Sequence, residues 1–154
     1  MRSTISSAFL LMILTIIVAA GPMPAAAQQP ALEGEGTRVG TKIVIRDLKR
    51  DDGGTVTLRF RMINQSDKPQ GLYQLLGGYL DDRVHLLDSA NKKKYLVVKD
   101  ATGKCECTQI RGNVSKDEPV NLWAKFPAPP DGVQKVAVVV DGFEPVESVP
   151  ITAR

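Results

Sequence analysis

Apolar and polar residues alternate along several short stretches of this chain, which is the pattern of β-strands with one buried face. The clearest stretch is 55–63, where Val, Leu, Phe and Met alternate with Thr and Arg. The stretch 42–48 carries two isoleucines at the same spacing. The glycine-rich turn 49–54 separates this stretch from 55–63. The pattern therefore predicts a β-hairpin formed by these two strands.

The spacing of the apolar residues also suggests a register for this hairpin. If Ile43 faces Phe60 and Ile45 faces Leu58, the apolar residues of both strands lie on one face of the sheet. The polar residues between them then form an outer face in contact with water.

Five more strands follow from the same reasoning. The expected segments are 83–88, 94–99, 120–126, 136–140 and 146–151. The first two flank a polar turn and form a second hairpin, while 136–140 is apolar on both faces, as in a central or covered strand. Residues 72–80 fit a short helical turn or an irregular strand equally well, and both alternatives stay open.

About seven short strands, separated by turns every 8 to 12 residues or so, favour an all-β fold. No segment beyond the N-terminus has a sustained helical period. We therefore expect an antiparallel β-sandwich of the immunoglobulin-like type.

The N-terminal residues 1–27 have the pattern of a secretory signal peptide. Arg2 supplies a basic start, an apolar run covers 9–20, and the Ala-x-Ala sequence at 25–27 predicts cleavage after Ala27. A membrane anchor is the alternative, but the apolar run is only about 12 residues long, against roughly 20 needed to span a bilayer. We expect an exported product, periplasmic or secreted, without stable membrane insertion after cleavage.

The segment after the predicted cleavage site divides into a leader and a domain. Residues 28–38 are polar and glycine-rich, which predicts a flexible leader. Residues 39–154 then form one domain, long enough for a core without metal or disulfides. The whole chain has a formal net charge of +3. A value this close to zero does not indicate a nucleic-acid or anionic membrane partner.

Three stretches of the chain resemble a known group of proteins. They are GLYQLLGG at 71–78, KKYLVVKDATGKCECT at 93–108 and LWAKFPAPPDGVQKVAVVVDGFEPVESVPI at 122–151. Together they resemble exported bacterial domains, frequent in actinobacteria, some of which are fused to outer-membrane-protein-A-like peptidoglycan-binding domains. The resemblance implies an immunoglobulin-like sandwich and export, and it implies no particular activity or cell-wall attachment.

Cys105 and Cys107 are the only two cysteines of the chain. In an exported protein a disulfide between them is expected, although two residues of a flat strand stand too far apart and a local turn near Gly103 is needed. Bridges to another chain, free thiols, and redox or metal chemistry are the alternatives. A loop this small stabilises the fold by only about 1.6 kcal/mol.

Trp123 is the most informative aromatic residue. The alternation in 120–126 places it on the outer face, opposite Val120, Leu122 and Phe126. One possibility is that a neighbouring loop, such as the proline-rich segment that follows, covers the ring. The other is that the ring contacts a sugar or a protein partner.

A group of basic residues is expected on the same outer face. In the register given above, Lys42 lies opposite Arg61, with Arg46 and Arg59 close by. Like charges directly opposed destabilise a sheet, so acidic groups should neutralise them. Solvent and the side chains of the next strand can do so, and an anionic wall polymer or an acidic partner is the alternative.

No catalytic or metal-binding arrangement is apparent in the sequence. The single histidine, His85, has no recognisable nucleophile near it, and the pairs Asp51–Asp52 and Asp81–Asp82 belong to turns. No cofactor is expected, and an envelope enzyme would need several loops to converge on His85.

The sequence therefore predicts a non-catalytic, extracytoplasmic interaction domain that binds a cell-envelope or protein partner. Trp123, Lys42, Arg59 and Arg61 are its candidate contact residues. The alternative is a small redox or metal-handling protein centred on Cys105 and Cys107.

Overall fold

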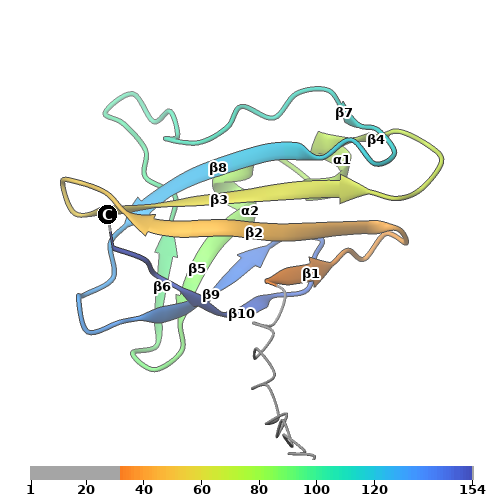
Figure 1. Ribbon diagram of the computed structural model, residues 1–154. Coiled ribbons are helices and arrows are strands. Elements are labelled where there is room, and N and C mark those ends of the chain that lie inside the picture. Colours follow the sequence, from red (N-terminus) through yellow and green to blue (C-terminus); the bar gives the residue numbers. More distant parts are fainter. Residues whose placement is uncertain (1–31, 154) are drawn as a thin grey trace, which may run out of the picture.

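The computed structural model describes residues 32–153, and these residues form an all-β domain, as predicted (Figure 1). Within them the chain forms ten strands and two one-turn helices. In chain order these are β1 (Glu33–Glu35), β2 (Thr41–Arg50), β3 (Thr55–Asn64), β4 (Gln70–Gly71), α1 (Leu72–Leu76), α2 (Leu80–Arg83), β5 (Val84–Asp88), β6 (Lys93–Leu96), β7 (Asn113–Val114), β8 (Val120–Pro127), β9 (Lys135–Val140) and β10 (Val146–Pro150). The predicted signal peptide lies outside the described residues.

The first sheet contains β1, β2, β3 and β8 in that order, and all its neighbours are antiparallel. The predicted hairpin of β2 and β3 is confirmed. Its turn is shorter than expected because Gly53 and Gly54 both take positive φ, at 85° and 76°. The backbone amide of Asp51 donates to the Thr55 carbonyl at 2.9 Å and closes this turn.

The predicted register of the hairpin is wrong by two residues. Ile43 faces Met62, and Ile45 faces Phe60 rather than Leu58. Side chains alternate with a period of two, so a shift of two residues leaves the same side chains on the buried face. The assignment of the faces is therefore right although the individual pairs are not.

A β-bulge interrupts β2 between Ile45 and Asp47. A bulge inserts one extra residue into a strand and re-aims the side chains that follow. Here it turns Leu48 back into the core, where it faces Leu58, and it leaves Asp47 opposite Arg59. The bulge therefore determines which charges the outer face of this sheet presents.

The second sheet has the order β10, β9, β5 and β6, again antiparallel throughout. Strand β9 is central, as its apolar composition predicted. Strand β10 is at an edge, where Pro150 is tolerated because the proline nitrogen has no hydrogen to donate. In Figure 1 the strands of this sheet run across those of the first.

One hydrophobic core joins the two sheets. Phe60 and Phe126 reach into it from the first sheet, and Leu86 and Val138 reach into it from the second. All four are almost completely buried. Burial of this kind is the main favourable contribution to folding.

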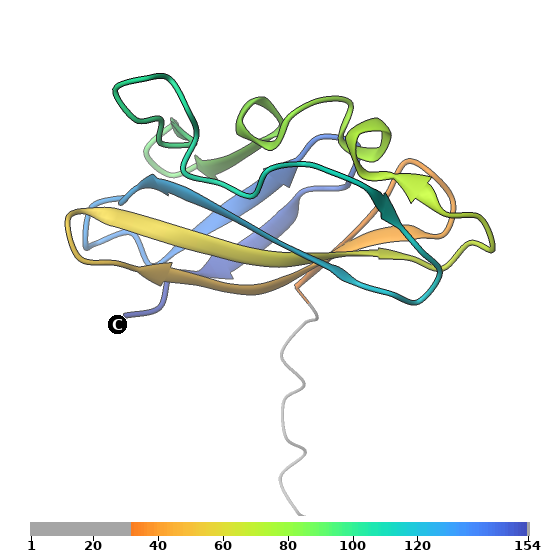
Figure 2. The ribbon, with the colours of Figure 1, turned by 90° about the horizontal axis from the view of Figure 1, so that it is seen from above.

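The segment 72–80, which the sequence left open, contains α1 and the start of α2, joined by the non-helical residues 77–79. Leu72, Leu76 and Leu80 are buried and extend the core. Figure 2 shows these two turns, in green, on the side of the molecule away from β2 and β3. No helix among residues 32–153 is long and apolar enough to cross a membrane.

The predicted flexible leader, 28–38, is wrong for its described part. Strand β1 pairs with β2, and the Leu32 carbonyl accepts a hydrogen bond from the β2 backbone at 2.7 Å. The amide of Glu144 also donates to the Glu35 carbonyl at 2.8 Å. The folded domain thus includes Leu32 and does not begin at Val39. A three-residue strand is too short for the sequence pattern to reveal it.

Replacing Phe60 with alanine is expected to lower the free energy of unfolding by about 3–5 kcal/mol, because it leaves a cavity at the centre of the core. Lys49→Ala on the adjacent strand removes an exposed side chain and should change the value by no more than about 0.5 kcal/mol. Urea denaturation measures both. Equal losses for the two variants would contradict the described core.

Candidate functional site

The outer face of the first sheet holds most of the predicted contact residues. Trp123 projects from β8 onto this face and is 38% exposed. Two backbone hydrogen bonds to one residue fix its position: the Trp123 carbonyl accepts from the Thr108 amide at 2.9 Å, and the Trp123 amide donates to Thr108 Oγ1 at 2.8 Å. The indole is therefore held on a well-supported strand and remains accessible.

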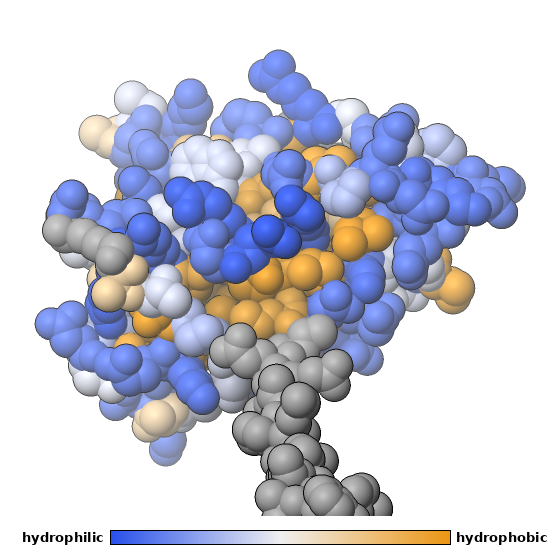
Figure 3. Space-filling model, viewed as in Figure 1, coloured by the Kyte–Doolittle hydropathy of each residue, from blue (hydrophilic) through white to orange (hydrophobic). Residues whose placement is uncertain are grey.

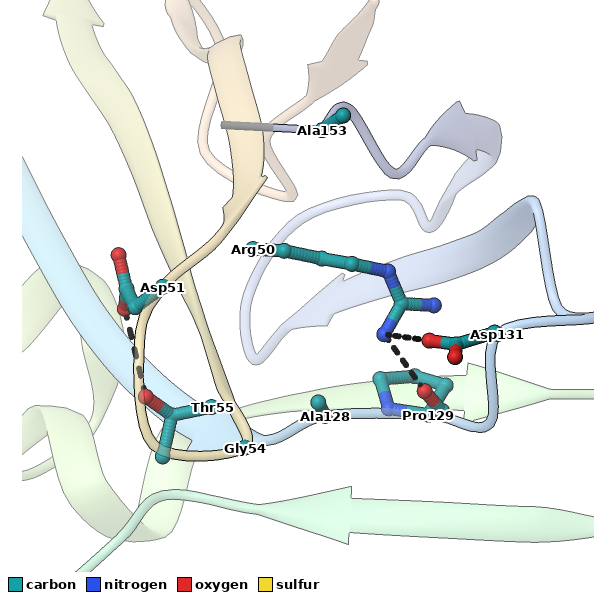
Figure 4. A pocket seen from close by; sticks show the side chains of 8 residues that line it. All are labelled: Arg50, Asp51, Gly54, Thr55, Ala128, Pro129, Asp131 and Ala153. Atoms are coloured by element: carbon teal, nitrogen blue, oxygen red, sulfur yellow. Dashed lines mark hydrogen bonds and ion pairs between the residues drawn. The ribbon is translucent and has the colours of Figure 1, made fainter.

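The proline-rich segment does not cover Trp123. Arg50 holds that segment at the turn end of the sheet, donating to the Pro129 carbonyl at 2.8 Å and the Pro130 carbonyl at 3.1 Å. Figure 4 shows Arg50 pointing at Pro129 and Asp131, whose carboxylate lies 3.5 Å away. The hollow beside Arg50 measures about 490 Å³. The guanidinium of Arg50 is already bonded to these partners, so we infer that Arg50 stabilises the proline-rich segment.

A shallow hollow of about 260 Å³ lies next to Trp123. It brings together residues from the three long strands of the sheet. Its lining consists of Arg46, Asp47, Arg59, Phe60, Asn121, Leu122 and Trp123. In Figure 3, strands β2, β3 and β8 face the reader, and hydrophilic side chains gather across them with apolar ones exposed in between.

Positive charge exceeds negative charge around this hollow. Arg59 lies directly opposite Trp123 in the sheet and forms an ion pair with Asp47 at 3.1 Å. Arg61 donates from Nε to the side-chain oxygen of Asn121 at 3.1 Å, which is a neutral partner. Arg46 has no salt bridge to any group in residues 32–153. Of these three arginines, only Arg59 has a carboxylate partner within residues 32–153.

Lys42 does not belong to this group. It faces Ile63 instead of the predicted Arg61, and it forms an ion pair with Glu33 of β1 at 2.9 Å. The hydrogen bond to Glu33 raises the pKa of the Lys42 ammonium. The prediction that an acidic group of a neighbouring strand neutralises this lysine thus agrees with the structure, but Lys42 is removed from the candidate site.

Sequence reasoning found Trp123, Arg59 and Arg61 but missed Asp47. The period-two pattern of β2 gave no sign of the bulge that brings its carboxylate to Arg59. Arg46 was placed correctly on the outer face, although the register used to place it was wrong.

The predicted disulfide between Cys105 and Cys107 is present, with the two Cα atoms 5.3 Å apart. The required turn is there as well: Gly103 has φ of 83°, and its amide donates to the Asp100 carbonyl at 3.0 Å. The Asp100 carboxylate accepts hydrogen bonds from the Thr102 hydroxyl and from the backbone amides of Lys104 and Thr102, and these bonds lower its pKa. Because the sulfurs are bonded to each other, neither is a free thiolate here.

The acidic pairs have structural partners. Asp51 accepts hydrogen bonds from Thr55 and Thr57, and Asp81 forms an ion pair with Lys99 at 2.8 Å. Asp82 lies 3.6 Å from the same ammonium. Within the described part of the chain, no three histidine, cysteine or acidic residues are grouped so as to hold a metal ion.

No family model, curated protein or solved structure matches this chain. The resemblance to exported sandwich domains therefore stays a prediction.

His85 is half-buried in β5, between Leu96 of β6 and Val139 of β9. Burial lowers the pKa of its imidazole, and the positive charge of Lys94 lowers it further, while Asp141 opposes the shift. The neutral form of His85 is thus favoured in the folded state.

The lowered pKa of His85 predicts a pH dependence of stability. Below the unfolded-state pKa of about 6.5, the unfolded chain binds this proton more readily than the folded one, so the free energy of unfolding falls as the pH decreases. His85→Gln should remove this part of the slope in denaturant titrations across pH 5 to 8 or so. The single histidine resonance in an NMR titration gives the pKa directly, and a value above 6.5 would contradict the expectation.

Proposed function

We propose that this protein is a non-catalytic interaction domain that binds an anionic partner on the outer face of its first sheet, around Trp123. The observation that carries the proposal is an accessible indole beside a hollow lined by Arg46 and Arg59, with Arg61 bonded to the neighbouring Asn121, where only Arg59 has a carboxylate partner among the described residues. We favour an acidic polysaccharide of the cell envelope as the partner.

The residue types of this face fit such a ligand. An indole ring offers a broad apolar platform against which the C–H face of a sugar can stack. The guanidinium group of arginine donates two parallel hydrogen bonds to a carboxylate or phosphate, which a lysine cannot do. Arg61 and Arg46 lack an acidic partner within the described chain and are available for this role.

We further propose that the domain is an immunoglobulin-like sandwich. The constant-type arrangement has strands A, B, E and D in one sheet and G, F and C in the other, and variable types add C′ beside C. The orders β2, β3, β8 and β10, β9, β5, β6 correspond to A, B, E and G, F, C, C′. The segment 105–108, which is hydrogen-bonded along the free edge of β8, supplies strand D.

Export from the cytoplasm is part of the same proposal. The N-terminal sequence pattern predicts it, and a disulfide in a small domain is typical of oxidising compartments. A binding role without catalysis is supported by the surroundings of His85, which pairs in its sheet with Leu96 and Val139 rather than with a nucleophile.

Immobilised polygalacturonate, an acidic polysaccharide, is the probe that tests the binding face, with neutral dextran as the reference polymer. We expect retention of the mature protein on polygalacturonate alone. Retention should weaken as salt is raised, because exposed charges are screened. Trp123→Ala should weaken it about tenfold, as is typical of an aromatic anchor, and Arg61→Ala should reduce the salt dependence.

The matched control is Leu96→Ala, which removes an exposed apolar side chain from the other sheet. It should bind like the unmodified protein. Unchanged retention of Trp123→Ala would show that the outer face is not the binding site. Equal retention on dextran would show that the partner is not recognised by its negative charge.

A further inference from the structure

We propose that the domain has a second binding site, a small hollow between the disulfide segment and the start of α2, which takes one neutral saccharide unit stacked on the ring of Tyr79. This site is separate from the Trp123 face and goes beyond the function proposed above. It includes Tyr79, for which the sequence alone suggested no role.

Tyr79 is the most exposed aromatic residue of the described chain, at 62%. Tyr73 holds its ring in an edge-to-face contact, with ring centroids 5.3 Å apart and an interplanar angle of 78°. Gly77 makes this contact possible because its φ of 71° ends α1 and reverses the chain. The ring is therefore fixed on one side by an aromatic neighbour while most of its surface stays accessible.

A hollow of about 340 Å³ has Tyr79 among its lining residues. Leu80 and Ile110, both buried, are apolar parts of its lining. This volume is at the lower end of small-molecule sites, which suits one ring of a sugar and not a larger ligand.

The rest of the lining can form hydrogen bonds. The ammonium of Lys104 can donate them and the amide of Gln109 can both donate and accept, whereas the Asp81 carboxylate in the same lining is paired with Lys99. The Gln109 amide has only the weak contact of 3.8 Å to the Cys105 sulfur. An aromatic residue combined with donors and acceptors in the same lining is the chemistry that recognises a ring carrying many hydroxyl groups.

The disulfide gives this hollow a fixed wall. Cys105 forms an isolated β-bridge with Lys99, and Cys107 forms one with Ala124 at the edge of β8. The bond between the sulfurs holds these two attachments together, and both cysteines line the hollow. A disulfide that closes a loop of three residues adds little to the global stability of the fold. We therefore assign this disulfide the role of shaping the wall of the hollow.

Saturation-transfer difference NMR tests the site with two neutral probes, the β-1,4-linked tetrasaccharides of glucose and of N-acetylglucosamine. We expect transfer to at least one of them. Tyr79→Ala should weaken its binding about tenfold, whereas Tyr79→Phe, which keeps the ring, should bind like the unmodified protein. Replacing both cysteines with serine should weaken binding about threefold, because the wall is no longer preorganised.

Circular dichroism confirms that each variant is folded before it is titrated. Val39→Ala is the matched control and should bind the neutral probe normally, because Val39 is exposed and does not line the hollow. Absence of transfer to both probes, or equal binding by the Tyr79→Ala variant, would overturn the proposed site. Loss of binding in Trp123→Ala alone would also overturn it, by assigning the sugar to the first sheet.

Discussion

Burial of one face of β3 is the constraint on which the rest of the structure depends. This strand lies between β2 and β8, and its side chains Val56, Leu58, Phe60 and Met62 are almost completely buried. A sheet with one continuous apolar face needs a second layer to cover it, and the sheet of β10, β9, β5 and β6 is that layer. The opposite face of β3 stays on the outside of the sandwich and carries Arg59 and Arg61, as the alternation of side chains predicts.

The edges of the first sheet explain where the two proposed sites lie. Strand β1 covers part of the β2 edge, and the segment 105–108 covers the β8 edge. Covering an edge prevents unwanted strand pairing. At the β8 edge the same segment also fixes the backbone of Trp123 and lines the hollow next to Tyr79. One short disulfide-bonded segment therefore supports both surfaces.

The alternation of side chains located the seven longer strands and the buried face of most of them. Strand β6 is the exception, because it ends at Leu96 rather than at the predicted Lys99 and none of its residues is buried. It could not give the register of β2 and β3, because a shift of two residues preserves every face and the turn geometry decides between the alternatives. Strands of two or three residues, such as β1, have no period to detect. The helical turns at 72–83 became clear only from the packing of Leu72, Leu76 and Leu80 against the sheets.

The alternation of side chains also predicted part of the candidate site, because it assigns residues to a face of the sheet but gives neither the register nor a bulge. Trp123, Arg59 and Arg61 follow the alternation and were assigned to the outer face correctly. Lys42 was grouped with them by the wrong register, and Asp47 reached the site through a bulge. Tyr79 was missed because its exposure depends on the chain reversal at Gly77, a tertiary feature without a periodic signal.

Native-state hydrogen exchange tests the central constraint most directly. If both sheets depend on the buried face of β3, the amides of its central residues should exchange only through global unfolding, with a free energy equal to that from denaturant titration. The amides of the edge strands β6 and β10 should exchange at a lower free energy. Exchange of the β3 amides at a lower free energy than those of the edge strands would contradict this account.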